Sequence, residues 1–316
     1  MLTNVKFKGG RGFYGSGIYV KLIDGGKFIV DSCFFSGSST YRLGGAIYAE
    51  LESEGNIFEV KGETIIQNYF VYAYDGIFMG GNGILFDVVG QGSEILIEGD
   101  ILFYNLRSTW SGDQGGALYF SALFGQTILI SKTTFQICSS SLGGAIIAVV
   151  EQEGEYMTFE DCSGIDEGGG FYCSSQGQVY LNKMTFNNCS CRTGGGMWIS
   201  YKATLQGEVT FSDCSTTQID GSGGGISIIC NNDITITGKM TFLRCQSVNR
   251  GGGLYILYIN GVIANSNSMT FKNCTALSKG GGAYILTQHY EWLKLNQLLF
   301  DECKSQYGGG IYADID

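Results

Sequence analysis

The residues of this sequence that are best suited to chemistry are its eleven cysteines. A cysteine thiolate is a nucleophile, a soft metal ligand and a partner in disulfide exchange, so a set of cysteines can serve redox chemistry or bind metal. Seven of the cysteines end a recurring Phe-x-x-Cys pattern and therefore share one repeated position. These seven are Cys138, Cys162, Cys189, Cys214, Cys245, Cys274 and Cys303.

Metal binding and acid–base catalysis both need side chains that converge on one point. A linear row of cysteines does not converge tetrahedrally, and the chain has one histidine, His289, so we expect no metal site and no cofactor. Carboxylates precede several of the cysteines, but amides and cations such as Asn187 and Arg244 interrupt them, which is typical of a solvated edge. Because one histidine would have to serve every Ser–His or Cys–His scheme, we predict no catalytic residues and no enzyme activity.

An internal repeat determines which elements position these residues. Each Phe-x-x-Cys leads into Gly-Gly-(Gly or Ala) and then an apolar residue, usually followed by Tyr, as in the run from Gly194 to Trp198. Looser copies begin at Phe7, Phe35, Ile66 and Phe103, which gives about eleven copies with a period of mostly 28 or 29 residues. A period of this size without helical periodicity indicates a β-solenoid.

Each copy contains three short strands separated by turns. One strand precedes the Phe, as in Ile95-Leu96-Ile97, one carries the Phe, and one follows the glycines. We therefore predict an all-β fold, a right-handed parallel β-helix of about eleven coils that forms a single domain over residues 1–316. The absence of proline fits a body of paired strands in which every backbone N–H is needed.

Strand alternation assigns each repeated position to the inside or the outside. The Phe and the apolar residue two positions earlier face inward, and the Thr between them faces outward. We expect a core column made of Phe135, Phe159, Phe186, Phe211, Phe242, Phe271 and Phe300.

The cysteines allow two interpretations. Equivalent positions on successive coils lie about 4.8 Å apart, within the Cα range of a disulfide, but parallel Cβ vectors fit that bond poorly. The cysteine row is therefore either a ladder of buried thiols or a partly paired set in an oxidising compartment. Cys33, Cys173 and Cys230 are expected to face inward, and Cys191, which lies in a predicted turn, is expected to be the most exposed.

The strand after the glycines predicts an exposed aromatic face. Its first and third residues are apolar and face inward, so the second faces outward, with Leu85, Ile147 and Ser227 as the non-aromatic exceptions. The aromatic members are Tyr19, Tyr48, Tyr119, Tyr172, Trp198, Tyr255, Tyr284 and Tyr312. Such a row either stabilises the sheet through contacts between strands or forms a face that binds a sugar chain or a neighbouring fibre.

Charge and composition exclude several classes of partner. The net charge is −10 and Lys and Arg do not cluster, which argues against nucleic acid and anionic membranes, and no apolar run is long enough for membrane insertion. The glycine triplets are not followed by a helix, so they do not indicate a nucleotide site. Two N-x-S/T sequons, at Asn188 and Asn273, are consistent with an extracellular glycoprotein.

The two motifs together resemble the repeats of chlamydial polymorphic outer-membrane proteins, which belong to the pectin-lyase-like class of β-helices. The runs 44–48, 115–119 and 143–147 match the first motif of that family, Gly-Gly-Ala-(Ile or Leu)-Tyr, closely. In the second motif, Phe-x-x-Asn, seven copies have Cys where the family has Asn, and such Cys-rich variants resemble large surface proteins of protists. The resemblance implies a surface-displayed adhesin without enzyme activity.

These observations favour a non-enzymatic structural or adhesive rod at the cell surface or outside the cell. The sequence opens within one Phe strand and stops after a Gly strand, with no polar cap, so we expect open ends that continue into a longer protein or stack end to end into a filament. The alternatives are a polysaccharide-active enzyme of the pectin-lyase-like class and a glycan-binding module that uses the tyrosine row.

Overall fold

The computed structural model describes residues 1–37, 39–71, 80–108, 114–122, 127–148, 152–230, 234–258, 263–265, 268–287 and 293–315. Over these residues the chain is an all-β solenoid of stacked parallel strands, with about nine turns and no helix. The expected fold class is confirmed. The number of turns is slightly smaller than the eleven repeats.

Most turns have four strand positions rather than three. The strands before the Phe are β1 (Leu2–Thr3), β5 (Lys27–Asp31), β9 (Ile57–Lys61), β19 (Gln152–Glu155), β29 (Ile234–Ile236), β33 (Ile263–Asn265) and β37 (Leu293–Lys294). The Phe strands are β2 (Lys6–Lys8), β6 (Phe34–Ser36), β10 (Ile65–Gln67), β20 (Thr158–Glu160), β23 (Thr185–Asn187), β26 (Glu208–Ser212), β30 (Lys239–Leu243), β34 (Met269–Lys272) and β38 (Leu298–Asp301). Two strands, β13 (Glu94–Tyr104) and β16 (Thr127–Gln136), cover both positions.

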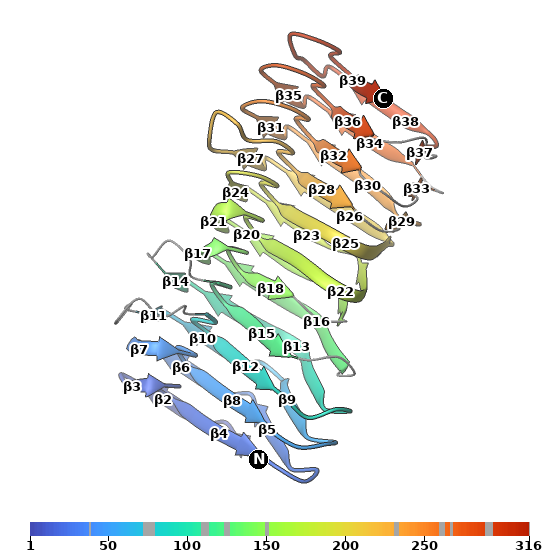
Figure 1. Cartoon of the computed structure of the whole chain (residues 1–316). Helices are drawn as coiled ribbons and strands as arrows, with labels where there is room; N and C mark the ends of the chain where they lie inside the picture. The colour runs from blue at the N-terminus through green and yellow to red at the C-terminus, as the bar shows by residue number, and fades with distance from the viewer. Residues whose placement is uncertain are drawn as a thin grey trace.

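The Gly strands follow the glycine triplets. They are β4 (Ile18–Leu22), β8 (Ile47–Leu51), β12 (Ile84–Val88), β15 (Leu118–Ala122), β18 (Ile146–Ala148), β28 (Ile226–Cys230), β32 (Leu254–Tyr258), β36 (Ala283–Thr287) and β39 (Ile311–Ile315). In β22 (Phe171–Asn182) and β25 (Met197–Gln206) the Gly strand continues into the next strand of the turn. Figure 1 shows the Gly strands stacked from β4 near the N-terminus to β39 at the C-terminus.

The additional strand lies between the Phe-x-x-Cys pattern and the glycines. These post-Cys strands are β3 (Arg11–Tyr14), β7 (Ser39–Leu43), β11 (Phe70–Val71), β14 (Arg107–Ser108), β17 (Ser139–Leu142), β21 (Ser163–Glu167), β24 (Ser190–Cys191), β27 (Ser215–Thr216), β31 (Gln246–Ser247) and β35 (Thr275–Ala276). They form a separate ten-stranded parallel sheet, while the other strands form one sheet of 29. Many of the post-Cys strands are only two residues long and rich in Ser and Thr, so their sequences are typical of turns.

The inward columns lie where the alternation predicts. The rings of successive Phe residues from Phe103 to Phe300 stack with centroids 4.6–5.1 Å apart. The six rings from Phe135 to Phe271 are fully buried, and Phe300 is partly buried because no described turn follows it. Met157, Met184, Met240 and Met269 join the same core. The core is therefore a set of ladders that run along the solenoid axis.

The glycine triplets serve two purposes at successive positions. The first glycine has positive φ, as at Gly194 (+67°), which turns the chain into the Gly strand. The second allows the backbones of neighbouring turns to approach, because a Cβ on Gly195 would lie 2.2 Å from the carbonyl oxygen of Gly224. The two roles thus fall on two neighbouring glycines of the same triplet.

Candidate functional site

The second residues of the Gly strands form one row that faces away from the core, which we call the outward lane. Its members are paired in register along the solenoid: Tyr19, Tyr48, Leu85, Tyr119, Ile147, Tyr172, Trp198, Ser227, Tyr255, Tyr284 and Tyr312. The core includes Ile47 and Ala49 on either side of Tyr48, but it does not include Tyr48 itself. The predicted direction of this row is therefore right.

The predicted exposure of the outward lane is wrong for most of its length. Tyr19 is 52% exposed, but Tyr48, Trp198, Tyr255 and Tyr284 are exposed by only 5%, 7%, 8% and 1%. Tyr119, Tyr172 and Tyr312 are partly buried. Part of the cause is mutual stacking, since neighbouring rings of the lane lie 4.7–5.6 Å apart. These rings therefore stabilise the sheet over most of the lane rather than present an open face.

A second row of side chains covers the rings, and we call it the cover lane. It consists of the residue before each glycine motif: Tyr14, Leu43, Gly80, Gln114, Leu142, Glu167, Thr193, Ser222, Arg250, Lys279 and Tyr307, most of them joined by parallel pairing. Lys279 Nζ lies 4.4 Å from the ring centroid of Tyr312, and Arg250 Cζ lies 5.1 Å from that of Tyr284. Each cation thus covers the ring of the following turn through a cation–π contact.

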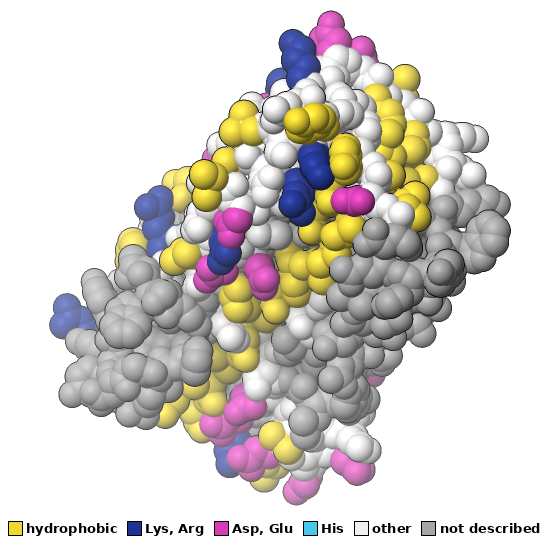
Figure 2. Space-filling view, turned by 45° about the horizontal axis from the view of Figure 1, so that its top comes forward, with side chains coloured by type: hydrophobic (Ala, Val, Ile, Leu, Met, Phe, Trp, Pro, Cys, Tyr) yellow, Lys and Arg dark blue, Asp and Glu magenta, His cyan; other side chains and the backbone are white. Residues whose placement is uncertain are grey.

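The outward surface beside the rings changes character along the molecule. The fourth residue of the Gly strand is charged in early turns, as at Lys21, Glu50 and Asp87, and apolar in late turns, as at Leu257 and Leu286. Figure 2 shows a band of hydrophobic side chains along one face of the molecule, with basic and acidic side chains beside it.

Carboxylates accompany the rings in the first turns. The Tyr19 hydroxyl donates to Glu50 Oε2 at 2.8 Å, and the Tyr48 hydroxyl donates to Asp87 Oδ2 at 3.4 Å. Burial raises the pKa of the Asp87 carboxyl, and the neighbouring charge of Glu50 raises it further. Burial also raises the pKa of Tyr48, so this hydroxyl stays a donor at neutral pH. The first turns therefore offer hydrogen-bond acceptors next to aromatic rings.

The outward lane is interrupted at three turns, and one interruption is hollow. Leu85, Ile147 and Ser227 are 3%, 1% and 0% exposed, so all three side chains are buried. At Leu85 there is a hollow of about 170 Å³, which we call the Leu85 notch. It is lined by Leu43, Tyr48, Gly80, Leu85, Asp87, Gln114, Tyr119 and Ser121.

The geometry of the Leu85 notch follows from Leu85 and Gly80, which are smaller than the residues at the equivalent positions of most other turns. Leu85 is in register with Tyr48 on one side and Tyr119 on the other, so an aliphatic side chain stands where most turns carry a ring. Gly80 replaces the cover residue, and a Cβ there would lie 2.9 Å from Cγ of Tyr119. The notch is thus bordered by two aromatic rings, a carboxylate, an amide and a hydroxyl. That set of groups is suited to binding a small polar ring.

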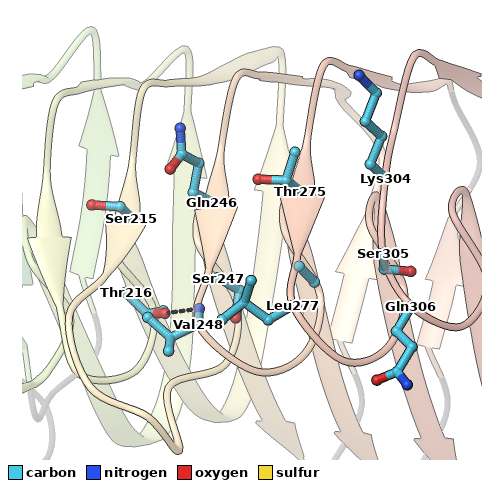
Figure 3. A pocket seen from close by; sticks show the side chains of 11 residues that line it. Ser215, Thr216, Gln246, Ser247, Val248, Thr275, Leu277, Lys304, Ser305 and Gln306 are labelled. Carbon is cyan, nitrogen blue, oxygen red and sulfur yellow. Dashed lines mark hydrogen bonds between the residues drawn. The ribbon is translucent and has the colours of Figure 1, made fainter.

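A larger hollow of about 570 Å³ lies along the post-Cys strands β27, β31 and β35. Figure 3 shows Ser215, Gln246, Thr275 and Lys304 side by side on successive turns along it. Several hydroxyls that line it are already occupied within the turns. Thr216 Oγ1 accepts from the Val248 amide at 2.8 Å, and Ser247 Oγ donates to the Gly221 carbonyl at 2.9 Å. Its lining includes no aromatic ring and no carboxylate, so we regard it as a weaker candidate site than the Leu85 notch.

The seven repeated cysteines form a ladder of free thiols. Six are fully buried, and Cys303 in the last turn is partly buried. Each thiol donates to two carbonyls, as Cys162 Sγ does to Phe135 of the preceding turn at 3.4 Å and to Glu160 at 3.5 Å. Burial raises the pKa of the Cys138, Cys189 and Cys245 thiols, which opposes thiolate formation. Buried, hydrogen-bonded thiols of this kind are packing groups.

The remaining cysteines include one wrong prediction. Cys33 and Cys173 belong to the core, as expected. Cys191 is not exposed but fully buried, and burial raises its pKa to about 12. The reason is that Cys191 lies in the post-Cys strand β24, in register with Thr216, rather than in a turn. The side chain of Cys230 and the whole of His289 lie outside the described residues.

The turn between Phe and Cys is a repeated left-handed corner, which the sequence analysis treated only as a solvated edge. The residue two positions after the Phe has φ of +51° to +58° in most turns, as at Asn68, Asp161 and Asn273. Asn and Asp tolerate this conformation best among residues with a side chain, so their recurrence there was the signal for the corner.

The polar groups at this corner pair with one another rather than form a catalytic set. Asp213 forms an ion pair with Arg244, and Lys272 forms one with Asp301. Both sequon asparagines occupy the corner: Asn188 is exposed and donates to Asp161 Oδ1 at 2.6 Å, while Asn273 is partly buried.

Within the described ranges, no group of three or more His, Cys, Asp or Glu side chains is arranged to hold a metal ion. No helix with the length and hydrophobicity of a membrane span occurs in that part of the chain. Comparison with protein-family models, with curated proteins and with solved structures finds no match.

Proposed function

We propose that this chain is a non-enzymatic structural and adhesive rod of an extracellular or cell-surface protein. The observation that carries the proposal is the continuous register of the strands: the Phe strands and the Gly strands pair in parallel from each described turn to the next. A solenoid of this kind gains length by adding turns, and each turn contacts only its neighbours. This suits a spacer or display element. The resemblance to polymorphic outer-membrane repeats of the pectin-lyase-like class supports the same role.

We further propose that the stack of turns continues past the described turns, into a second copy or into adjoining sequence of the same protein. In the register used between all neighbouring turns, a second copy would place Tyr19 after Tyr312 and Phe7 after Phe300. Two charged pairs are complementary in this register, since Lys21 would follow Asp314 and Lys8 would follow Asp301. One pair is unfavourable, since Arg11 would follow Lys304.

Electron microscopy and sedimentation of the purified chain test the stacking between copies. We expect rods longer than one copy, which spans roughly 50 Å for eleven strands at about 4.8 Å, and a sedimentation coefficient that rises with concentration. The variant Asp314→Lys should shorten the rods by like-charge repulsion with Lys21, and the double variant Asp314→Lys with Lys21→Asp should restore them. Rods of one-copy length at every concentration would contradict stacking between copies.

Display of the purified chain on beads, followed by binding to cells or extracellular matrix, tests the adhesive role separately. Retention of the beads above the level of an inert protein supports it, and retention equal to that level contradicts it. This measurement does not depend on whether copies stack.

A further inference from the structure

We infer that the Leu85 notch is a binding site for a single hexopyranose ring, such as one residue of a glycan. The inference concerns a ligand class and does not depend on whether the chain acts as a rod. It also differs from the expectation of binding along the whole tyrosine row, because the rings of Tyr255 and Tyr284 are buried.

The size of the notch corresponds to one small ring. Its volume of about 170 Å³ equals the share of roughly six water molecules in the liquid, at about 30 Å³ each. Leu85 lies in register between Tyr48 and Tyr119, so its side chain forms the floor of the hollow between the two rings. A pyranose chair bound there would lie over Leu85.

The walls of the notch match the two kinds of surface that a pyranose offers. The C–H faces of the sugar would lie against the aromatic rings of Tyr48 and Tyr119, which are apolar surfaces. The hydroxyl groups at the edge of the sugar would meet Asp87, Gln114 and Ser121, which together offer a carboxylate, an amide and a hydroxyl. A sugar hydroxyl that donates to Asp87 would form a charge-assisted hydrogen bond.

The notch is marked by its hollow and not by the exposure of Leu85, which is only 3% exposed and forms the floor. At the other two interruptions, Ile147 and Ser227 are buried. Ser227 is in register with Tyr255, and Arg250 interacts with the hydroxyl of Tyr255. At the notch the cover position is Gly80, so no side chain from that position lies over the ring of Tyr119. The combination of a missing ring at residue 85 and a missing cover side chain at residue 80 makes this turn different from its neighbours.

Saturation-transfer NMR with methyl glycosides of glucose, galactose and mannose tests the inference on the intact chain. We expect transfer to the ring protons of at least one of the three glycosides. The variant Leu85→Tyr should abolish that transfer, because a tyrosine there restores the ring of the lane and fills the notch. The matched control Ser227→Tyr adds a ring at an interruption of the same lane that does not adjoin the notch, and it should leave the transfer unchanged.

A second variant tests the polar wall without filling the space. Asp87→Asn keeps the shape but removes the charge, and it should weaken binding at least threefold in a titration of the glycoside that shows transfer. Absence of transfer to all three glycosides, or equal transfer to wild type and Leu85→Tyr, would overturn the inference. Circular dichroism of each variant shows whether the fold is kept, and the rod length in the microscope reports on the structural role independently.

Discussion

At the scale of single residues, the second glycine of each triplet shows how closely neighbouring turns approach. A Cβ on Gly195 would lie 2.2 Å from the Gly224 carbonyl oxygen and 2.5 Å from that of Ser215. Because both atoms belong to the backbone, no side chain can move aside. We expect Gly195→Ala to cost about 3 kcal/mol or more of unfolding free energy, through forced separation of two turns.

Gly92 provides the matched control for this prediction. Unlike Gly195 it has positive φ (+64°), and a Cβ there would meet no atom within 4 Å. Gly92→Ala should cost only the backbone strain of about 1 kcal/mol. Urea denaturation followed by circular dichroism measures both changes, and equal losses for the two variants would show that close approach of the turns is not the reason for the glycine.

The buried thiol of Cys191 predicts a dependence of stability on alkaline pH. Burial raises its pKa from 9 to about 12, so the folded state holds this proton more tightly than the unfolded state does. The stabilisation is complete below pH 9 and is lost as the pH rises from 9 toward 12. At pH 10 the loss is on the order of 1 kcal/mol.

The melting temperature between pH 7 and 10.5 measures this effect. Wild type should lose stability as the pH rises, and Cys191→Ala should lose less over the same interval, although the ladder thiols continue to contribute. The same slope for both proteins would contradict a titrating Cys191. Ellman's reagent at pH 8 gives an independent check, since buried thiols should react only after unfolding, with the partly buried Cys303 first.

At the scale of elements, the Phe strands concentrate the packing energy. Phe186 is fully buried, with Phe159 at 4.6 Å on one side and Phe211 at 4.8 Å on the other. We expect Phe186→Ala to cost about 3–5 kcal/mol. Phe300→Ala should cost roughly half as much, because Phe300 is partly buried and stacks on Phe271 alone. Urea denaturation of the two variants tests this, and equal losses would mean that the stack itself adds little.

The inward half of each element could be predicted from sequence because it depends on local alternation. A residue such as Phe186 or Met184 faces inward whatever the neighbouring turn does, since strand periodicity decides it. The positions of the glycines could also be interpreted from the sequence, because few other residues tolerate either a positive φ or such a close contact between backbones.

The outward half could not be predicted in the same way. Whether Tyr284 is exposed depends on Arg250 and on the rings of adjacent turns, which lie about 30 residues away in the sequence. The post-Cys strand was missed for a related reason. Two residues such as Ser190 and Cys191 carry no period, and only pairing with the next turn makes them a strand. The Leu85 notch combines both difficulties. It forms where the outward lane lacks an aromatic ring at residue 85 and the cover lane lacks a side chain at residue 80.

At the scale of the whole molecule, the fold is nearly one-dimensional. Each turn pairs only with the turn before and the turn after it, and no described strand links distant turns directly. Stability is then the sum of single turns and of the contacts between neighbouring turns. A destabilising substitution in one turn should therefore increase local unfolding at the nearer end of the solenoid before it affects the other end.

Hydrogen exchange of two variants, one near each end of the solenoid, tests this last expectation. Phe271→Ala should speed exchange in β34, β36, β38 and β39 and leave β8, β12 and β15 protected. Phe35→Ala, in the second turn, should do the reverse, since Phe35 is fully buried and stacks on Phe7 at 4.7 Å. If either variant raised exchange equally in all turns, the solenoid would unfold as one cooperative unit. The coupling between turns would then be much stronger than contacts between nearest neighbours imply, and a rod built from such turns would resist local opening along its entire length.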